Sequence, residues 1–210
     1  MGLVSRERVL QAGPAAALDG FPVLRWAGTF FRAARHAPWW FCRCGGCRFD
    51  LEDPVEPLMG TLYAGTDEVS GVMETIGPEL VGGTISRRFL ADRTVWMLSY
   101  DRPLHVAELA SPAAVGFGVT NELASMTPYA IPQAWASALH QAGWDGISYR
   151  TRFNTGSVAT GLALFDLAGS HPDWPAEAIG SADAPVIVSS LAARGIAVDD
   201  PPPLAALSLR

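Results

Sequence analysis

The chain has 210 residues, of which 49% are hydrophobic, and this length predicts one domain with a trailing segment. All fifteen basic residues are arginines, which excludes mechanisms that need a lysine nucleophile or a phosphate-loop lysine. The formal net charge of −6 argues against direct binding to nucleic acid, which requires a basic surface. Residues 21–49 nevertheless hold five arginines and no acid, a pattern that favours a small anion such as a phosphate ester.

The sequence predicts a cytoplasmic protein with no membrane segment. No run of 18 apolar residues occurs, and residues 1–20 do not have the pattern of a signal peptide. Cys42, Cys44 and Cys47 are too few and too close together for a disulfide framework, and they fit a reducing compartment best.

Six strands are predicted. In the first, at 60–64, Thr61 and Tyr63 share one face and Leu62 lies on the other. Five more segments are rich in β-branched and aromatic residues and lie next to turn residues: 85–90, 94–100, 104–109, 146–149 and 162–166. We expect the middle segments to pair antiparallel. The sequence thus predicts an α+β fold, in which helices flank a mixed, largely antiparallel sheet.

Two helices are predicted between these strands. The first has Thr66 as its N-cap, repeats apolar residues at helical spacing, and ends at a Gly-Pro pair. Glu74 lies off that apolar stripe. The second helix begins at Pro128 or Pro132 and ends at Gly143.

Six short segments then follow one another in a recognisable order. They are Phe31-Arg32, Arg48-Phe49-Asp50, Leu62-Tyr63-Ala64, Glu74, the stretch DGISYRTR at 145–152, and Leu162-Ala163-Leu164-Phe165. This order resembles the RES domain, which is named for an arginine, a glutamate and a serine. The resemblance covers about 30–166, so we expect a RES domain at 1–166 and a C-terminal extension at 167–210 that packs on the same domain.

The resemblance implies an activity, a fold and a partner. The activity is cleavage of the nicotinamide–ribose bond of NAD+ by phosphorolysis or hydrolysis, with phosphate as a co-substrate and no cofactor or metal. Related members transfer ADP-ribose to a protein instead. The implied fold is similar to that of ADP-ribosyltransferase toxins. The implied partner is a helix-turn-helix antitoxin of the Xre type, encoded beside the toxin, that blocks its pocket.

The chemistry of NAD+ cleavage agrees with these residue types. Breaking the bond to nicotinamide builds positive charge on the ribose, and a nearby carboxylate stabilises that charge in the transition state. Glu74 is the candidate for this role. Arg32 and Arg48 offer planar charged forks to the pyrophosphate, and Tyr63 offers a ring that can stack on nicotinamide or adenine.

The stretch at 145–152 supplies the remaining candidates. Aligned on its YR-x-R pattern, the family's serine falls on Thr151, which keeps the hydroxyl but adds a methyl group. Of Arg150 and Arg152, at most one is expected to face the pocket, and Arg152 is the choice. By resemblance, the catalytic set is Glu74, Arg32 and Thr151, and the substrate-binding set is Arg48, Tyr63 and Arg152.

Several alternatives stay open at this point. The chain could transfer ADP-ribose to a protein, or it could be a silent binding module that has lost turnover through Thr151. His36 with Cys42, Cys44 and Cys47 supplies four zinc-ligand types, although small residues filling a glycine-rich loop explain the cysteines more simply. A monomer and a homodimer both remain open.

Overall fold

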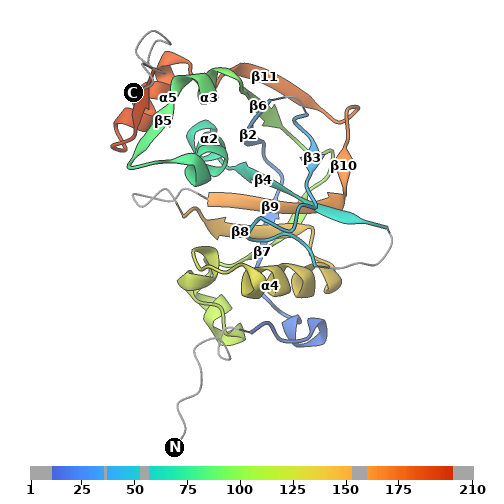
Figure 1. Cartoon of the computed structure of the whole chain (residues 1–210). Coiled ribbons are helices and arrows are strands. Elements are labelled where there is room, and N and C mark those ends of the chain that lie inside the picture. Colours follow the sequence, from blue (N-terminus) through green and yellow to red (C-terminus); the bar gives the residue numbers. More distant parts are fainter. Residues whose placement is uncertain (1–10, 36, 53–56, 153–159, 201–210) are drawn as a thin grey trace, which may run out of the picture.

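An eight-stranded sheet organises the computed structural model, which describes residues 11–35, 37–52, 57–152 and 160–200 (Figure 1). Its strands are β1 (Val23–Trp26), β2 (Phe30–Ala34), β4 (Met59–Gly65), β6 (Thr94–Leu98), β7 (Leu104–Glu108), β8 (Gly146–Arg150), β9 (Thr160–Leu167) and β11 (Ala176–Ser181). Their order across the sheet is β1-β7-β8-β9-β4-β2-β6-β11. Only the β7–β8 pair is parallel. This confirms the predicted α+β fold with a mixed, largely antiparallel sheet.

Shorter elements surround this sheet. Two small pairs are formed by β3 (Trp40–Phe41) with β10 (Gly169–Ser170), and by β5 (Thr84–Ser86) with β12 (Ala197–Asp199). The α-helices are α2 (Glu68–Ile76), α3 (Arg87–Ala91), α4 (Ala130–Gln141) and α5 (Pro185–Ala192). The 3₁₀ turns are η1 (Ala15–Leu18), η2 (Gly77–Glu79), η3 (Pro112–Phe117) and η4 (Asn121–Ala124). None of the helices described is long and apolar enough to cross a membrane.

The core divides between the two faces of the sheet. Along β9, Leu162 and Leu164 join one cluster, whereas Ala163 and Phe165 join another, because side chains alternate across a strand. The face that carries Ala163 and Phe165 is covered by α4 over β8 and by α2 over β2 and β4 (Figure 1). The face of β4 between these two helices positions the site.

Most predicted strands are confirmed to within two residues, because each shows alternation or β-rich composition between turn residues. The strand predicted at 85–90 is wrong, since only Thr84–Ser86 is extended and α3 follows directly. The fold buries Ile85 from the strand and Leu90 from the helix in one cluster. The expected antiparallel pairing of the middle strands is also wrong in part, because β6 and β7 lie far apart in the sheet and β7 runs parallel to β8.

Helix α2 sits unusually close to the sheet, and this closeness fixes its polar residues. A Cβ at Gly71 would lie 2.4 Å from the carbonyl oxygen of Phe31, and a Cβ at Gly65 would lie 2.3 Å from the nitrogen of Gly71. The helix is capped by Asp67, whose carboxylate accepts from the backbone nitrogen of Ser70 at 2.9 Å, so the predicted N-cap one residue earlier is wrong.

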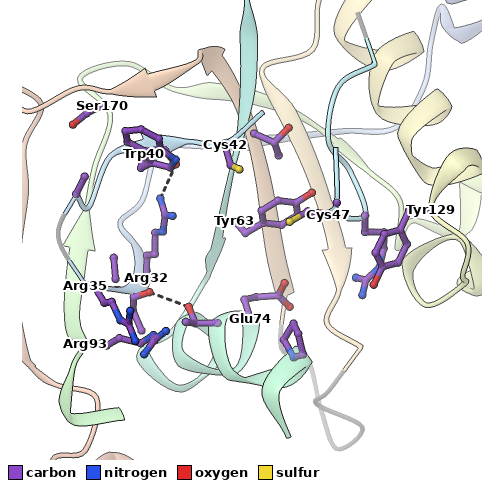
Figure 2. A pocket seen from close by; sticks show the side chains of 18 residues that line it. Arg32, Arg35, Trp40, Cys42, Cys47, Tyr63, Glu74, Arg93, Tyr129 and Ser170 are labelled. Carbon is purple, nitrogen blue, oxygen red and sulfur yellow. Dashed lines mark hydrogen bonds between the residues drawn. The ribbon is translucent and has the colours of Figure 1, made fainter. Parts of the chain in front are cut away.

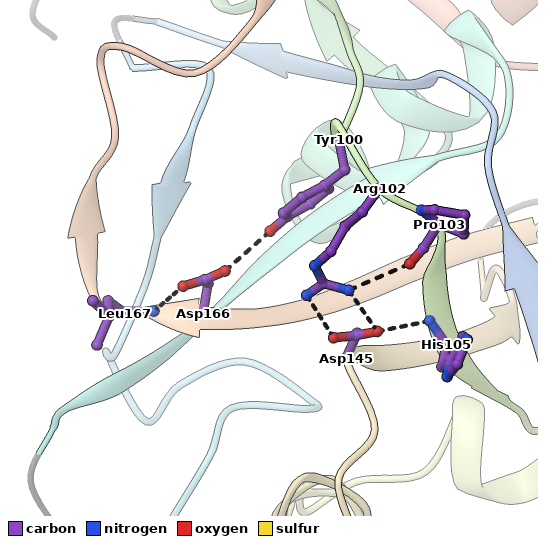
Figure 3. A network of polar contacts seen from close by, with 7 residues as sticks. All are labelled: Tyr100, Arg102, Pro103, His105, Asp145, Asp166 and Leu167. Carbon is purple, nitrogen blue, oxygen red and sulfur yellow. Dashed lines mark hydrogen bonds and ion pairs between the residues drawn. The ribbon is translucent and has the colours of Figure 1, made fainter.

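Asp145, the first residue of the 145–152 motif, holds two strands together (Figure 3). Its carboxylate accepts from both terminal nitrogens of Arg102, at 3.1 and 2.8 Å, and from the backbone nitrogen of His105 at 2.7 Å. The arginine pairing lowers the pKa of Asp145, against the desolvation that raises it. Asp145 therefore fixes the start of β8 against β7 rather than taking part in a pocket.

Elements within residues 167–200 join the same sheet and core. Strand β11 pairs antiparallel with β6 at one edge of the sheet. Helix α5 places Ile187 and Leu191 in the cluster that α2 also enters.

Candidate active site

A cavity of about 740 Å³ opens on the sheet face between α2 and α4 (Figure 2). Strand β4 contributes Thr61 and Tyr63 to its wall, as the predicted alternation requires, whereas Leu62 lies in the cluster on the opposite face. Its charged lining comprises Arg32, Arg35, Arg48, Arg93 and Glu74. Four arginines against one carboxylate give the lining an excess of positive charge, which favours anionic ligands, although Arg35 also pairs with Asp92 at 3.4 Å.

Glu74 reaches the cavity from α2 (Figure 2). Its Oε2 accepts a hydrogen bond of 2.6 Å from the hydroxyl of Tyr149 on β8. Burial raises the pKa of Glu74, while the Tyr149 hydrogen bond and the charge of Arg48 lower it. The carboxylate is thus held in one orientation within a weakly solvated wall.

Tyr149 was not among the residues predicted for the site. It is fully buried, with its ring 4.9 Å from that of Phe49. Burial, followed by the charge of Glu74, raises its pKa well above the ordinary value, so the hydroxyl stays a proton donor. A signal was present in the sequence, because Tyr149 lies within the 145–152 motif, two positions before the chosen Thr151.

Arg48 lies beside Glu74 and is 8% exposed. Its guanidinium carbon is 5.9 Å from the ring centre of Tyr129 and 6.0 Å from that of Tyr149. Its Nε is buried and has no hydrogen-bond partner among the residues that the structure describes. A buried donor without a partner is costly, so a ligand oxygen at this point would be bound strongly.

Tyr63 and Arg32 line the cavity while they hold its walls. The Tyr63 hydroxyl accepts from the nitrogen of Phe49 at 2.7 Å and donates to Asp50 Oδ1 at 3.2 Å. Arg32 Nη1 donates to the carbonyl oxygen of Trp40 at 2.9 Å (Figure 2). Burial lowers the pKa of Arg32 to about 10, so it stays cationic at neutral pH. Both side chains keep the loop before Asp50 in place.

Thr151 and Arg152 lie elsewhere. They line a second cavity of about 160 Å³, with Thr120, Asn121 and Ser125 in its wall. The Thr151 hydroxyl is buried and lacks a hydrogen-bond partner within the described ranges. The structure therefore brings four of the six predicted site residues into one cavity and places the other two in a second, smaller cavity.

The cysteine loop borders the large cavity through Cys42 and Cys47. Cys44, Cys47 and Asp50 have ligand atoms within 4.8 Å of one another and are the candidate metal ligands of the described chain. His36, the fourth member of the predicted zinc set, lies outside the described residues. Asp50 was not part of that set, although it follows Cys47 by only three positions.

Comparisons with known proteins identify a similar fold and a matching family model. The chain is similar to the MbcT toxin in the crystal structure of the M. tuberculosis MbcT–MbcA toxin–antitoxin complex, with 15% sequence identity and a TM-score of 0.60 over 88% of this chain and 99% of that chain. No curated protein matches the sequence. The family model of the RES domain matches residues 22–185, which is more than half of the chain. The chain therefore belongs to the RES-domain family.

Proposed function

We propose that this protein is the toxin of a toxin–antitoxin pair and that it cleaves the nicotinamide–ribose bond of NAD+. One observation carries the proposal: the half-buried carboxylate of Glu74, oriented by Tyr149, lines a cavity whose other charged residues are all arginines. Membership of the RES-domain family supports the same activity. The cavity also has the size of a site for a small molecule, which is typically 300–1,000 Å³.

The arginines and Glu74 suit two different groups of NAD+, the pyrophosphate and the ribose that carries nicotinamide. The arginines offer forked donors to the negatively charged pyrophosphate, and Arg48 has a buried Nε that still lacks a partner among the described residues. The ribose becomes positive as nicotinamide leaves, and Glu74 supplies the negative charge that stabilises it. Because that charge develops only in the transition state, this interaction accelerates the bond cleavage rather than merely binding substrate.

The partner belongs to the same proposal. The similar M. tuberculosis toxin was crystallised in complex with an antitoxin. We infer that a helix-turn-helix antitoxin binds this chain and restrains its activity. Expression of the chain alone should arrest bacterial growth, and expression together with the small protein encoded beside it should restore growth.

The acceptor of the ADP-ribose group separates the related activities. The purified protein would be incubated with NAD+ labelled in its adenylate part, with and without inorganic phosphate, and nicotinamide release would be followed. Label in ADP-ribose 1″-phosphate indicates phosphorolysis, label in free ADP-ribose indicates hydrolysis, and label in a protein band indicates ADP-ribosyl transfer. No nicotinamide release under any condition would reject the NAD+ proposal and favour a silent binding module.

A further inference from the structure

The loop between β3 and β4 brings two thiols and a carboxylate together beside the cavity. Cys44 Sγ lies 3.6 Å from Cys47 Sγ and 3.2 Å from Asp50 Oδ2. At the usual bond lengths to zinc, tetrahedral ligands lie about 3.8 Å apart for two thiolates and about 3.5 Å apart for a thiolate and a carboxylate. Both separations from Cys44 are therefore close to those that one zinc ion requires, and the ligand atoms of Cys47 and Asp50 lie within 4.8 Å of each other.

The cluster is held in this arrangement by the fold. Gly45 has φ +67°, a conformation that favours glycine, and it turns the chain between the two cysteines. Gln133 on α4 donates to the carbonyl oxygens of Gly45 and Cys47, at 3.0 and 2.9 Å. The backbone nitrogen of Cys47 donates to Asp50 Oδ2 at 3.0 Å. The loop is thus anchored to α4, so its ligand atoms need little rearrangement to bind a metal ion.

Asp50 gives an independent reason to expect a cation. Its carboxylate is 1% exposed, yet none of the ion pairs found among the described residues includes it. Its partners are the Tyr63 hydroxyl, the Cys47 nitrogen and the Cys44 thiol. A buried carboxylate normally pairs with a positive charge or coordinates a metal ion.

We propose that Cys44, Cys47 and Asp50 bind one zinc ion. Zinc accepts both thiolate and carboxylate ligands, whereas magnesium and calcium prefer oxygen alone. Zinc can reach the site from solvent because the side chain of Cys44 is exposed. The three residues fill three coordination positions, and the fourth is open to water on the side where Cys47 lines the cavity. Binding displaces the proton that the Cys44 thiol shares with Asp50 and a second proton from Cys47.

This zinc site does not depend on the NAD+ proposal, although Cys47 also lines the cavity that we propose binds NAD+. Asp50 Oδ1 accepts from Tyr63, so a metal on Oδ2 would fix the residue that positions the Tyr63 ring. Metal binding, rather than NAD+ turnover, is therefore the quantity to measure.

The test uses the full chain, stripped with a chelator and kept in a reducing buffer. Zn²⁺ would be titrated against a chromophoric chelator, and Co²⁺ would be added separately to record the absorption band that thiolate ligands give. We expect one zinc ion per chain, a thiolate band with Co²⁺, and proton uptake when the metal is removed.

The variants assign the ligands. Cys44→Ser changes an exposed side chain and should weaken zinc binding at least about 100-fold without loss of folding. Cys47→Ser and Asp50→Asn should do the same, checked by circular dichroism. Cys42→Ser is the comparison variant, because Cys42 interacts with Cys44 but does not belong to the three-residue cluster, and it should bind zinc within threefold of the parent. A parent that binds no zinc, a Cys44→Ser variant that binds as the parent does, or a Cys42→Ser variant that loses binding would overturn the proposal.

Discussion

The hydroxyl of Tyr149 donates a 2.6 Å hydrogen bond to Oε2 of Glu74 and so joins β8 to α2. The two residues are 75 positions apart in the chain. Tyr149 holds the carboxylate in one rotamer and also lowers its pKa, against the larger effect of burial, which raises it. A single hydrogen bond thus orients the proposed catalytic group and favours its charged form against the effect of burial.

Removal of that hydrogen bond is the first prediction. Tyr149→Phe keeps the buried ring but leaves Glu74 without its donor, so the pKa of Glu74 should rise further. We expect kcat to fall about tenfold, which corresponds to about 1.4 kcal/mol. The acid limb of the pH profile of kcat/KM should move to higher pH. A purely structural role of Tyr149 would lower the activity equally at every pH and leave that limb in place.

The second prediction concerns the stability cost of Glu74. Burial raises its folded-state pKa above the ordinary value of 4.5, so its contribution to stability is fully present below pH 4.5 and is lost as the pH rises through the raised value. Glu74→Gln avoids this loss because the amide stays neutral. The variant should have a higher Tm than the parent at pH 8 and nearly the same Tm at pH 4. An equal difference at both pH values would show that Glu74 has an ordinary pKa.

Arg48 provides the third prediction. Arg48→Lys keeps the charge but loses the fork and its stacking beside Tyr129. We expect KM for NAD+ to rise about tenfold with a smaller change in kcat, because binding to the pyrophosphate is present before the reaction as well as during it. Arg43→Lys, an exposed arginine of the same loop, is the matched control and should behave as the parent. An unchanged KM in Arg48→Lys would make Arg48 structural.

Thr151 is the subject of the fourth prediction. Its buried hydroxyl has no partner among the described residues, so Thr151→Val should leave the Tm equal to or above that of the parent. If the hydroxyl binds a substrate oxygen, as the resemblance implies, this variant should lose about tenfold in turnover, and Thr151→Ser should stay active. The measurement is nicotinamide release from all three proteins. Parent-like release by Thr151→Val would show that the second cavity takes no part in the reaction.

Sequence patterns within a short segment predicted those elements whose structure depends on residues close to one another in the chain. The strand at 60–64 was predicted because alternation alone decides which side chains face the core, and Tyr63 lines the cavity for that reason. Residues 85–90 have strand composition, but β5 extends only as far as its partner β12, which comes more than 100 positions later. Pairing over such a distance leaves no local signal in the sequence.

The same distinction applies to the candidate site. Glu74, Arg48, Arg32 and Tyr63 were predicted from motifs, and the fold brings them to one cavity. The hydrogen bond of Tyr149 could not be predicted, since it depends on how closely α2 approaches the sheet, which Gly65 and Gly71 permit. The role of Asp50 was missed for a similar reason, because its burial follows from the packing of the loop against α4.

The measurement that tests the account most directly is nicotinamide release from NAD+ by Glu74→Gln, compared with the parent and with Glu68→Gln. Glu68 lies on the same helix and is exposed, so its change to glutamine alters the net charge identically without reaching the cavity. We predict that Glu74→Gln folds normally and loses two or more decades of turnover, which corresponds to at least about 2.7 kcal/mol of transition-state stabilisation, while Glu68→Gln keeps the parent rate. Turnover by Glu74→Gln within a factor of three of the parent would contradict the assignment of this cavity as the site of NAD+ cleavage.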